Sequence, residues 1–200
     1  YRDEPKVMAI TGQNLQKKRW VGESNYYFSK YPHCWGWATW RRAWKFYDGN
    51  ISFWPNWRFT SSFTYIYSDT LEQNYWAKIF DRVKSRKIDS WNYPWTACCH
   101  FRKALIATPN LNLVSNIGFG PESTHTKKSN WLAEMNTFPI GSPGPAPSLS
   151  WDLNADRFVF DEVFGGKKNR FPHLIYMIPR RFAGSIVRSL LNSKFVNSSL

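Results

Sequence analysis

The spacing of tryptophans between Tyr31 and Asp48 is the feature that most constrains this chain. Pro32 disfavours a helix before it, and Gly36 allows a sharp turn of the backbone. After Gly36, aromatic residues stand at i, i+3, i+7 and i+10, which is one stripe of an α-helix; they are Trp37, Trp40, Trp44 and Tyr47. The spacing predicts a helix from Trp37 to Tyr47 that stops at Asp48-Gly49-Asn50.

Two interpretations of this predicted helix stay open. Four large rings on one face are typical of a helix buried in a hydrophobic core. Alternatively, Gly36 lets a ligand approach the backbone at the helix N-terminus, which attracts anions, while the indole faces beside it suit sugar rings. The sequence Cys34-Trp35-Gly36-Trp37 is compatible with both, because a helix can bury one side and still offer its tip as the wall of a site.

The composition indicates a globular chain with an anionic partner. With 200 residues, of which 42% are hydrophobic and 18% aromatic, the chain is long enough for one domain with a core. Its net charge of +13 predicts attraction to nucleic acid, an acidic membrane surface or a nucleotide-diphosphate substrate. The basic residues are scattered, which argues against a protein dedicated to duplex DNA. The twelve tryptophans favour flat partners such as sugars and nucleobases.

Cysteine usage favours a reducing compartment. The three cysteines, two of them adjacent at Cys98 and Cys99, make no disulfide framework and match no zinc-site spacing. The sequence contains no signal peptide and no apolar run long enough to span a bilayer. We therefore expect a cytoplasmic protein. Because the first residues, beginning at Tyr1, look like the end of a helix running into a strand, we also expect a fragment.

The chain carries both strand and helix patterns. Short apolar runs predict strands at 7–10, 25–29 and 104–109. Helical spacing predicts helices that begin at Thr70, near Ser90 or Asn92, and at Asn154. Residues 50–69 are rich in aromatics without a clear period, so they form either a loop-rich lid or an irregular packed segment.

The C-terminal third contains a connector and a basic tail. Pro and Gly dominate residues 138–150, which predicts an irregular connector. Residues 179–195 have the pattern of a basic amphipathic helix. Such a helix either lies on an anionic membrane as a peripheral contact or packs on its own domain or a dimer mate.

Two further segments carry candidate polar groups. In Asp89-Ser90-Trp91-Asn92-Tyr93-Pro94-Trp95, polar groups at a helix start stand between tryptophans, which suits either a pocket or a simple helix cap. His125 lies in the polar loop 121–126, where an imidazole is either a hydrogen-bonding group or a metal ligand.

Three ordered motifs resemble a known family. They are Cys34-Trp35-Gly36-Trp37-Ala38-Thr39-Trp40-Arg41-Arg42-Ala43-Trp44, Asp89-Ser90-Trp91-Asn92-Tyr93-Pro94-Trp95 and Asn110-Leu111-Asn112-Leu113-Val114-Ser115-Asn116-Ile117-Gly118-Phe119-Gly120. In this order they resemble the C-terminal half of bacterial GT-A-type nucleotide-sugar glycosyltransferases, in the branch labelled hemolytic-protein-like. The match covers about Tyr1 to Thr126, and residues from Phe138 onward resemble the family only around Ala155-Asp156-Arg157-Phe158.

The resemblance implies an α/β fold of the Rossmann-like GT-A type, of which this chain would be the acceptor-side half with irregular aromatic loops and a helical C-terminal tail. In the family a divalent metal is held by an acidic motif that would lie before Tyr1. We expect three parts: residues 1–137 as the GT-A-like half, 138–150 as the connector and 151–200 as a helical extension.

The resemblance also implies roles for individual residues. His125 matches a histidine in a region where GT-A enzymes supply a ligand for Mn²⁺ or Mg²⁺. Asn92 stands where relatives have the aspartate that acts as general base, and an amide cannot take that proton at neutral pH. Asp89 is the nearest carboxylate that could replace it. Arg41 or Arg42 would face the diphosphate, and the substrate would contact Trp35, Gly36, Trp37, Trp91 and Trp95.

We therefore expect a glycosyltransferase that moves a sugar from a nucleotide donor to a glycan or lipid-linked acceptor. A metal ion would offset the charge of the leaving diphosphate. Two alternatives remain. The same aromatic surface could bind glycan without chemistry, as the replacement of the expected aspartate by Asn92 favours, or the basic chain could bind single-stranded nucleic acid.

Overall fold

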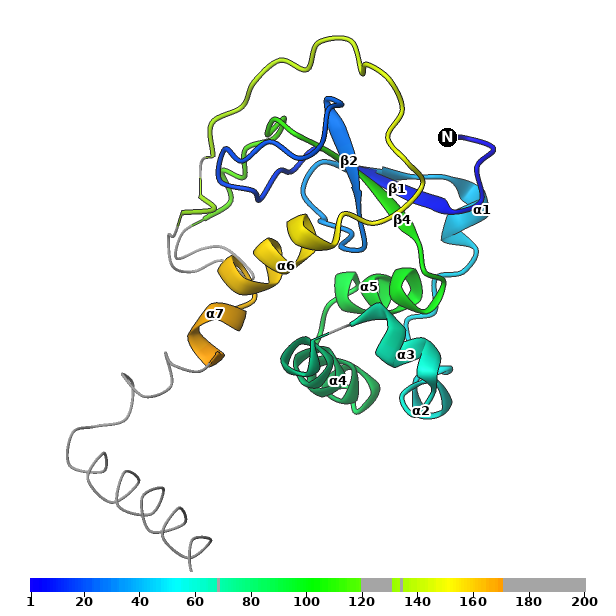
Figure 1. Ribbon diagram of the computed structural model, residues 1–200. Coiled ribbons are helices and arrows are strands. Elements are labelled where there is room, and N and C mark those ends of the chain that lie inside the picture. The colour runs from blue at the N-terminus through cyan, green and yellow to red at the C-terminus, as the bar shows by residue number, and fades with distance from the viewer. Residues whose placement is uncertain (68, 120–130, 134, 171–200) are drawn as a thin grey trace, which may run out of the picture. The chain divides into compact units, whose positions relative to one another are not determined.

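The computed structural model describes residues 1–67, 69–119, 131–133 and 135–170 (Figure 1). It divides into two compact units, Tyr1–Val159 and Phe160–Leu200. His125 and the predicted tail helix at 179–195 lie outside the described residues. The first unit carries the sheet and the predicted functional motifs, and it is described first.

A four-stranded mixed sheet organises the first unit, in the order β2-β4-β1-β3. The central strands β1 (Val7–Thr11) and β4 (Leu105–Pro109) are parallel, and all five residues of β4 are buried. The edge strands β2 (Tyr26–Ser29) and β3 (Trp37–Thr39) run antiparallel to β4 and β1 respectively. Parallel strands are joined by a crossover connection, and helices usually cover the faces of their sheet. The presence of a mixed sheet together with helices confirms the α/β class.

Most of the predicted elements are present. The three predicted strands correspond to β1, β2 and β4, each within two residues at either end. The helix expected at Thr70 is α4 (Thr70–Lys84), although Asp69 caps it: its Oδ1 accepts from Leu71 N at 2.8 Å. The next predicted helices are α5 (Asn92–Phe101) and α6 (Leu153–Glu162). The unassigned aromatic segment forms two short helices, α2 (Trp54–Trp57) and α3 (Ser61–Ile66).

The predicted tryptophan helix is wrong over its first half. Residues Trp37–Thr39 form β3, and only α1 (Arg41–Trp44) is helical. Gly36, at φ +59°, turns the chain onto the free edge of β1, where Thr11 pairs with Trp37. Backbone hydrogen bonds offered by that edge outweigh the helical spacing, which is a weak signal over so few residues.

Side chains from both faces of the sheet form the core. On one face, α5 packs Trp95, Cys98 and Cys99 against Met8 and Ile106. The opposite face carries a second cluster, partly covered by aromatic rings: Val7, Phe28, Leu105 and Ala107, beneath Tyr26, Trp40 and Trp151. Figure 1 shows α4 beside α5, so the bulk of the helical structure lies on the α5 side of the sheet. All three cysteines are free thiols.

The connector and the second unit have little regular structure. Residues 138–150 contain no helix or strand, as predicted. The boundary between the compact units falls inside α6 rather than at this connector. In the second unit, Gly165 at φ +81° precedes the short helix α7 (Gly166–Asn169), and Arg170 Nε bonds Asp161 Oδ1 at 2.9 Å. Within the described ranges, no helix has the length and apolarity needed to cross a bilayer.

Candidate functional site

The first and third sequence motifs cross at Gly36. A Cβ placed on this glycine would lie 2.2 Å from Cγ1 of Val114, so only glycine fits the crossing. Backbone hydrogen bonds tie the same point together: Gly12 N donates to Gly36 O at 2.7 Å, and Leu113 N donates to Gly12 O at 2.8 Å. Residues that are far apart in sequence therefore meet at one backbone contact, which we call the Gly36 junction (Gly12, Gly36, Leu113 and Val114).

Aromatic rings extend the Gly36 junction to the second motif. Trp37 stacks on Trp91, with ring centroids 5.2 Å apart and an interplanar angle of 23°. On the other side of Gly36, Trp35 meets Phe119 edge to face at 5.7 Å. Both distances lie within the range of favourable aromatic pairs. All three motifs thus converge on residues 35–37, although the first motif approaches as a strand and not as the predicted helix.

The Gly36 junction lies at the carboxyl ends of the two parallel strands. There, β1 ends at Thr11 and β4 at Pro109, and β3 begins opposite Thr11. In open α/β sheets, ligands bind preferentially outside this edge. The Gly36 junction therefore lies at the edge of the sheet where such folds place their ligands.

Asparagine side chains brace the loops at this edge. Asn14 Nδ2 donates to Pro109 O at 2.6 Å, and Asn112 Oδ1 accepts from Asn14 N at 3.1 Å. Asn110 Nδ2 donates to Val21 O at 2.8 Å, and its Oδ1 accepts from Val21 N at 2.9 Å. The asparagines of the third motif thus replace missing ladder hydrogen bonds, and they position the loops.

A hollow of about 480 Å³ opens beside Trp91, at the start of α5. We call it the Trp91 hollow. It is lined by Tyr47, Gly49, Asn50, Val83, Lys84, Arg86, Ile88, Asp89, Ser90, Trp91 and Pro94. Asp89 is exposed in it, and Trp91 is 45% exposed although Trp37 stacks against one of its faces. The hollow therefore combines an aromatic face, a carboxylate and two cationic side chains.

Asn92 sits at the edge of this arrangement, as the first residue of α5. Its N–H donates to Ser90 Oγ at 3.3 Å, so Ser90 satisfies an amide at the helix start. The Asn92 side-chain oxygen is buried and has no hydrogen-bond partner among the described residues. A buried unsatisfied amide oxygen is costly, and it cannot serve as a base. Asp89 is the carboxylate that lines the hollow.

Two predicted substrate contacts need correction. Trp95 is 1% exposed and packs in the core against Trp37 and Trp44, so it supports the Trp91 hollow without facing a ligand. Arg42 donates from Nη2 to Tyr1 O and Val7 O, at 2.9 and 2.7 Å, and from Nε to a third backbone carbonyl. A guanidinium committed to three carbonyls is a structural brace, whereas Arg41 is exposed on α1.

The metal prediction has no counterpart in the described part of the chain. No group of three or more His, Cys, Asp or Glu side chains is arranged there to hold a metal ion. His125 lies outside the described residues.

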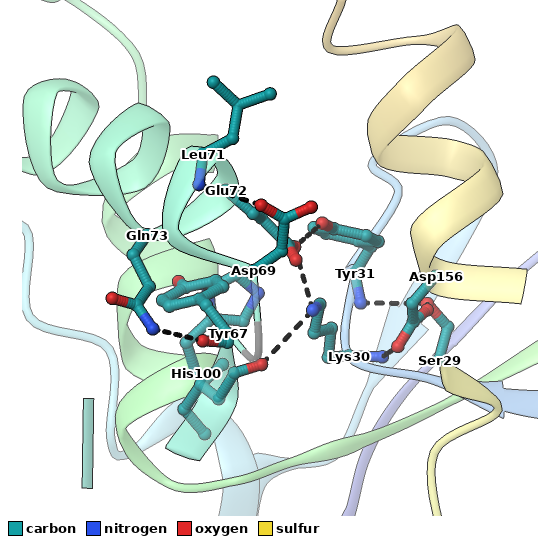
Figure 2. A network of polar contacts seen from close by, with 11 residues as sticks. Ser29, Lys30, Tyr31, Tyr67, Asp69, Leu71, Glu72, Gln73, His100 and Asp156 are labelled. Carbon is teal, nitrogen blue, oxygen red and sulfur yellow. Dashed lines mark hydrogen bonds and ion pairs between the residues drawn. The ribbon is translucent and has the colours of Figure 1, made fainter. Parts of the chain in front are cut away.

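A buried polar network, missed by the sequence analysis, lies between β2, α3, α4 and α6 (Figure 2). Lys30 Nζ contacts Glu72 Oε1 at 2.8 Å, and both side chains are about 5% exposed or less. The Tyr31 hydroxyl donates to the same carboxylate. Asp156 Oδ1 accepts from Ser29 Oγ at 2.5 Å, and its Oδ2 accepts from Lys30 N at 3.1 Å.

Burial shifts the pKa values of this network. It raises the pKa of Asp156 to about 7, against the opposing effect of Lys30. Burial likewise raises the pKa of Glu72, with Lys30 opposing, and lowers the pKa of His100 well below its usual value. Perturbed groups of this kind often mark active sites, but none of these side chains lines the Trp91 hollow. We therefore interpret the network as part of the scaffold. No local pattern in the sequence predicts that these side chains come together.

Searches of protein-family models, curated proteins and solved structures find no match for this chain.

Proposed function

We propose that this chain is the acceptor-side half of a nucleotide-sugar glycosyltransferase, with a sugar held in the Trp91 hollow. The convergence of three separate motifs on residues 35–37, at the carboxyl edge of a parallel strand pair, carries the proposal. Packing of the core alone does not require Gly36 and the exposed Trp91 to lie at the edge of the sheet where α/β folds bind ligands.

The chemistry of the Trp91 hollow suits a saccharide. A sugar ring has one apolar face, which packs on an aromatic ring, and a rim of hydroxyls that need donors and acceptors. Trp91 supplies a half-exposed ring whose orientation is fixed by its stack on Trp37. Asp89 accepts hydrogen bonds from hydroxyls, and the cationic groups of Lys84 and Arg86 donate them. An aromatic surface with a few placed polar groups is typical of small-molecule sites.

In this proposal Asp89 is the general base. Its carboxylate takes the proton of the acceptor hydroxyl, and the hydroxyl oxygen forms a bond to the anomeric carbon of the donor sugar. The bond between that carbon and the diphosphate oxygen breaks, and its electron pair leaves with the diphosphate. Lys84 and Arg86, which line the same hollow, lower the cost of the added negative charge.

A second candidate is a carbohydrate-binding protein that carries out no transfer. The observation that favours it is Asn92, an amide in the position where the resemblance implies the base. In that case Asp89 hydrogen-bonds a sugar hydroxyl and takes no proton.

Saccharide binding and transfer are measured separately. Binding of a panel of nucleotide sugars and neutral oligosaccharides is followed by saturation-transfer NMR, with and without Mn²⁺. We expect Trp91→Ala to abolish saturation of the protons of the neutral oligosaccharides, while Phe59→Ala, which removes a ring that is 83% exposed on another part of the surface, leaves it unchanged. No binding by the unaltered chain would remove both candidates.

Transfer of a labelled sugar to a glycan acceptor then separates the candidates. We expect Asp89→Asn to keep binding and to lower transfer by roughly 100-fold to 10,000-fold, the usual contribution of a general base. Oligosaccharide binding with no nucleotide requirement and no transfer would instead support the binding protein.

A further inference from the structure

We infer a second binding site, for an anionic saccharide, in a pocket of about 400 Å³ beside Trp20 and Trp131. The inference does not depend on the proposed function, because this pocket shares no lining residue with the Trp91 hollow. Its ligand class is a sugar that carries a carboxylate or phosphate group. We call it the Trp20 pocket; its walls come from the loop after β1, from residues 110–112, and from Trp131, Met135, Asn136 and Phe138.

Exposed aromatic rings form the walls of the Trp20 pocket. Trp20 is 51% exposed and Trp131 is 41% exposed, although indoles of this size are normally covered. Leu111 and Phe138 add apolar surface to the lining. Apolar surface gathered in a concavity indicates a ligand-contact surface more than a scattered exposed side chain does.

The polar floor of the pocket is already satisfied by the protein. Asn14, Asn110 and Asn112 all line it, and each side chain hydrogen-bonds backbone groups of the neighbouring loops. These bonds hold the pocket open in one shape, so a ligand need not order it. The aromatic rings and the Lys18 amine then provide the contacts for a ligand.

Two lysines at the pocket hold an unusual backbone conformation. Lys17 and Lys18 have φ values of +50° and +70°, the left-handed region that favours glycine. Lys17 Nζ lies 4.8 Å from the centre of the Trp131 ring. Consecutive non-glycine residues in this conformation are rare, and such strain clusters at ligand sites. Here the strain places two cations beside two aromatic rings.

This combination selects the ligand class. Aromatic rings alone would suit a neutral sugar, whereas the Lys18 amine attracts a ligand that carries negative charge. A single-stranded nucleic acid also combines charge and flat rings, but it requires a groove that continues along the backbone. The Trp20 pocket is a local concavity of about 400 Å³ lined by two tryptophans, which suits one or two sugar units.

Calorimetric titration of the chain with a hyaluronan tetrasaccharide, which contains glucuronate, tests the inference. The neutral counterpart is chitotetraose. We expect the acidic sugar to bind and chitotetraose to bind at least tenfold more weakly. We expect Trp20→Ala to weaken binding roughly tenfold or more, as removal of a buried aromatic anchor does, and Trp20→Phe to restore most of the affinity.

The charge requirement is tested with Lys18→Gln, which should weaken binding of the acidic sugar only, and less so at about 0.5 M salt, where screening is strong. Lys78→Gln on α4 is the matched control for charge, and Phe59→Ala is the control for ring removal. Both should bind as the unaltered chain does. Trp91→Ala should also leave this binding intact, which separates the inference from the proposed function.

Three results would overturn the inference: no binding of the acidic sugar, equal binding of both sugars, or full affinity in Trp20→Ala. Tighter binding of a single-stranded oligonucleotide that competes at Trp20 would assign the pocket to nucleic acid instead. Indole N–H resonances, assigned through the Trp20 and Trp131 variants, report where each ligand lies.

Discussion

Replacing Gly36 with alanine tests the geometry of the Gly36 junction directly. Two independent terms make the substitution unfavourable. The backbone at Gly36 has φ +59°, where a Cβ clashes with its own chain. The new methyl group would also lie 2.2 Å from Val114 Cγ1, a separation that real Cβ atoms do not adopt. Val114 or the strand must therefore move.

The size of the effect follows from these two terms. A left-handed conformation costs a non-glycine residue about 1–2 kcal/mol, and overpacking of a tight contact costs about 1–3 kcal/mol. We expect Gly36→Ala to lower the free energy of unfolding by about 2–5 kcal/mol in total. Gly22, at φ +66°, has only the first term, because no atom lies within 4 Å of the place that a methyl group would take.

Urea denaturation, followed by circular dichroism, compares the two variants. Because the backbone term and the effect on the unfolded chain are shared, Gly36→Ala should be less stable than Gly22→Ala by about 1–3 kcal/mol, the overpacking term. The double variant Gly36→Ala/Val114→Ala should recover most of that difference, since it removes the clashing Cγ1 atom. Equal stability of the two single variants would refute the packed crossing at Gly36.

Other predictions concern the buried network and the strained loop. Lys30→Met should destabilise the fold by about 3–5 kcal/mol because Glu72 would remain buried without its cation; the double variant Lys30→Met/Glu72→Leu should recover most of the loss in urea denaturation. The raised pKa of Asp156, about 7, contributes stability that is complete below about pH 4 and is lost as the pH rises to about 7. The lowered pKa of the buried His33, about 4, acts in the opposite direction, so that its contribution makes stability rise with pH between about pH 4 and 6.5. Asp156→Asn removes the opposing contribution of Asp156, so stability should rise more steeply with pH over that range. An unchanged dependence of stability on pH would contradict the raised pKa of Asp156. Lys18→Gly should relieve the steric strain of the left-handed conformation and raise the unfolding free energy by at most about 1 kcal/mol. It should also weaken binding of the acidic sugar. A loss of stability in this variant would contradict the claim that the backbone at Lys18 is strained.

Apolar spacing in the sequence predicted the helices and strands whose tertiary environment matches that spacing. The apolar runs of β1 and β4 are largely buried, so sequence alone indicated strands. The tryptophan segment failed because its helical spacing competed with an open sheet edge, which is visible only once β1 is placed. Spacing over one or two turns cannot outweigh a set of ladder hydrogen bonds.

The candidate site was predicted in part. Gly36, Trp37 and Trp91 were chosen from motifs, and the structure brings them together. Trp95 was chosen from the same motif as Trp91 yet lies in the core, because it is within α5 and faces the sheet, whereas Trp91 precedes the helix.

Charged and loop residues were the hardest to predict. Lys30, Glu72 and Asp156 come from three distant segments, and single charged residues ordinarily indicate solvent exposure. Their burial depends on tertiary packing that no local window contains. The Trp20 pocket was also missed, because Trp20 lies in a polar, basic segment that resembles a simple surface loop.

The most direct test of the central claim follows the indole N–H resonances of the chain during titration with a nucleotide sugar and with a neutral oligosaccharide. If Trp91, held by its stack on Trp37 beside the Gly36 junction, forms a wall of a sugar site, the resonances of Trp91 and Trp37 shift to saturation during the titration, and Trp91→Ala removes the response. Saccharide binding that leaves both resonances unmoved would contradict the claim.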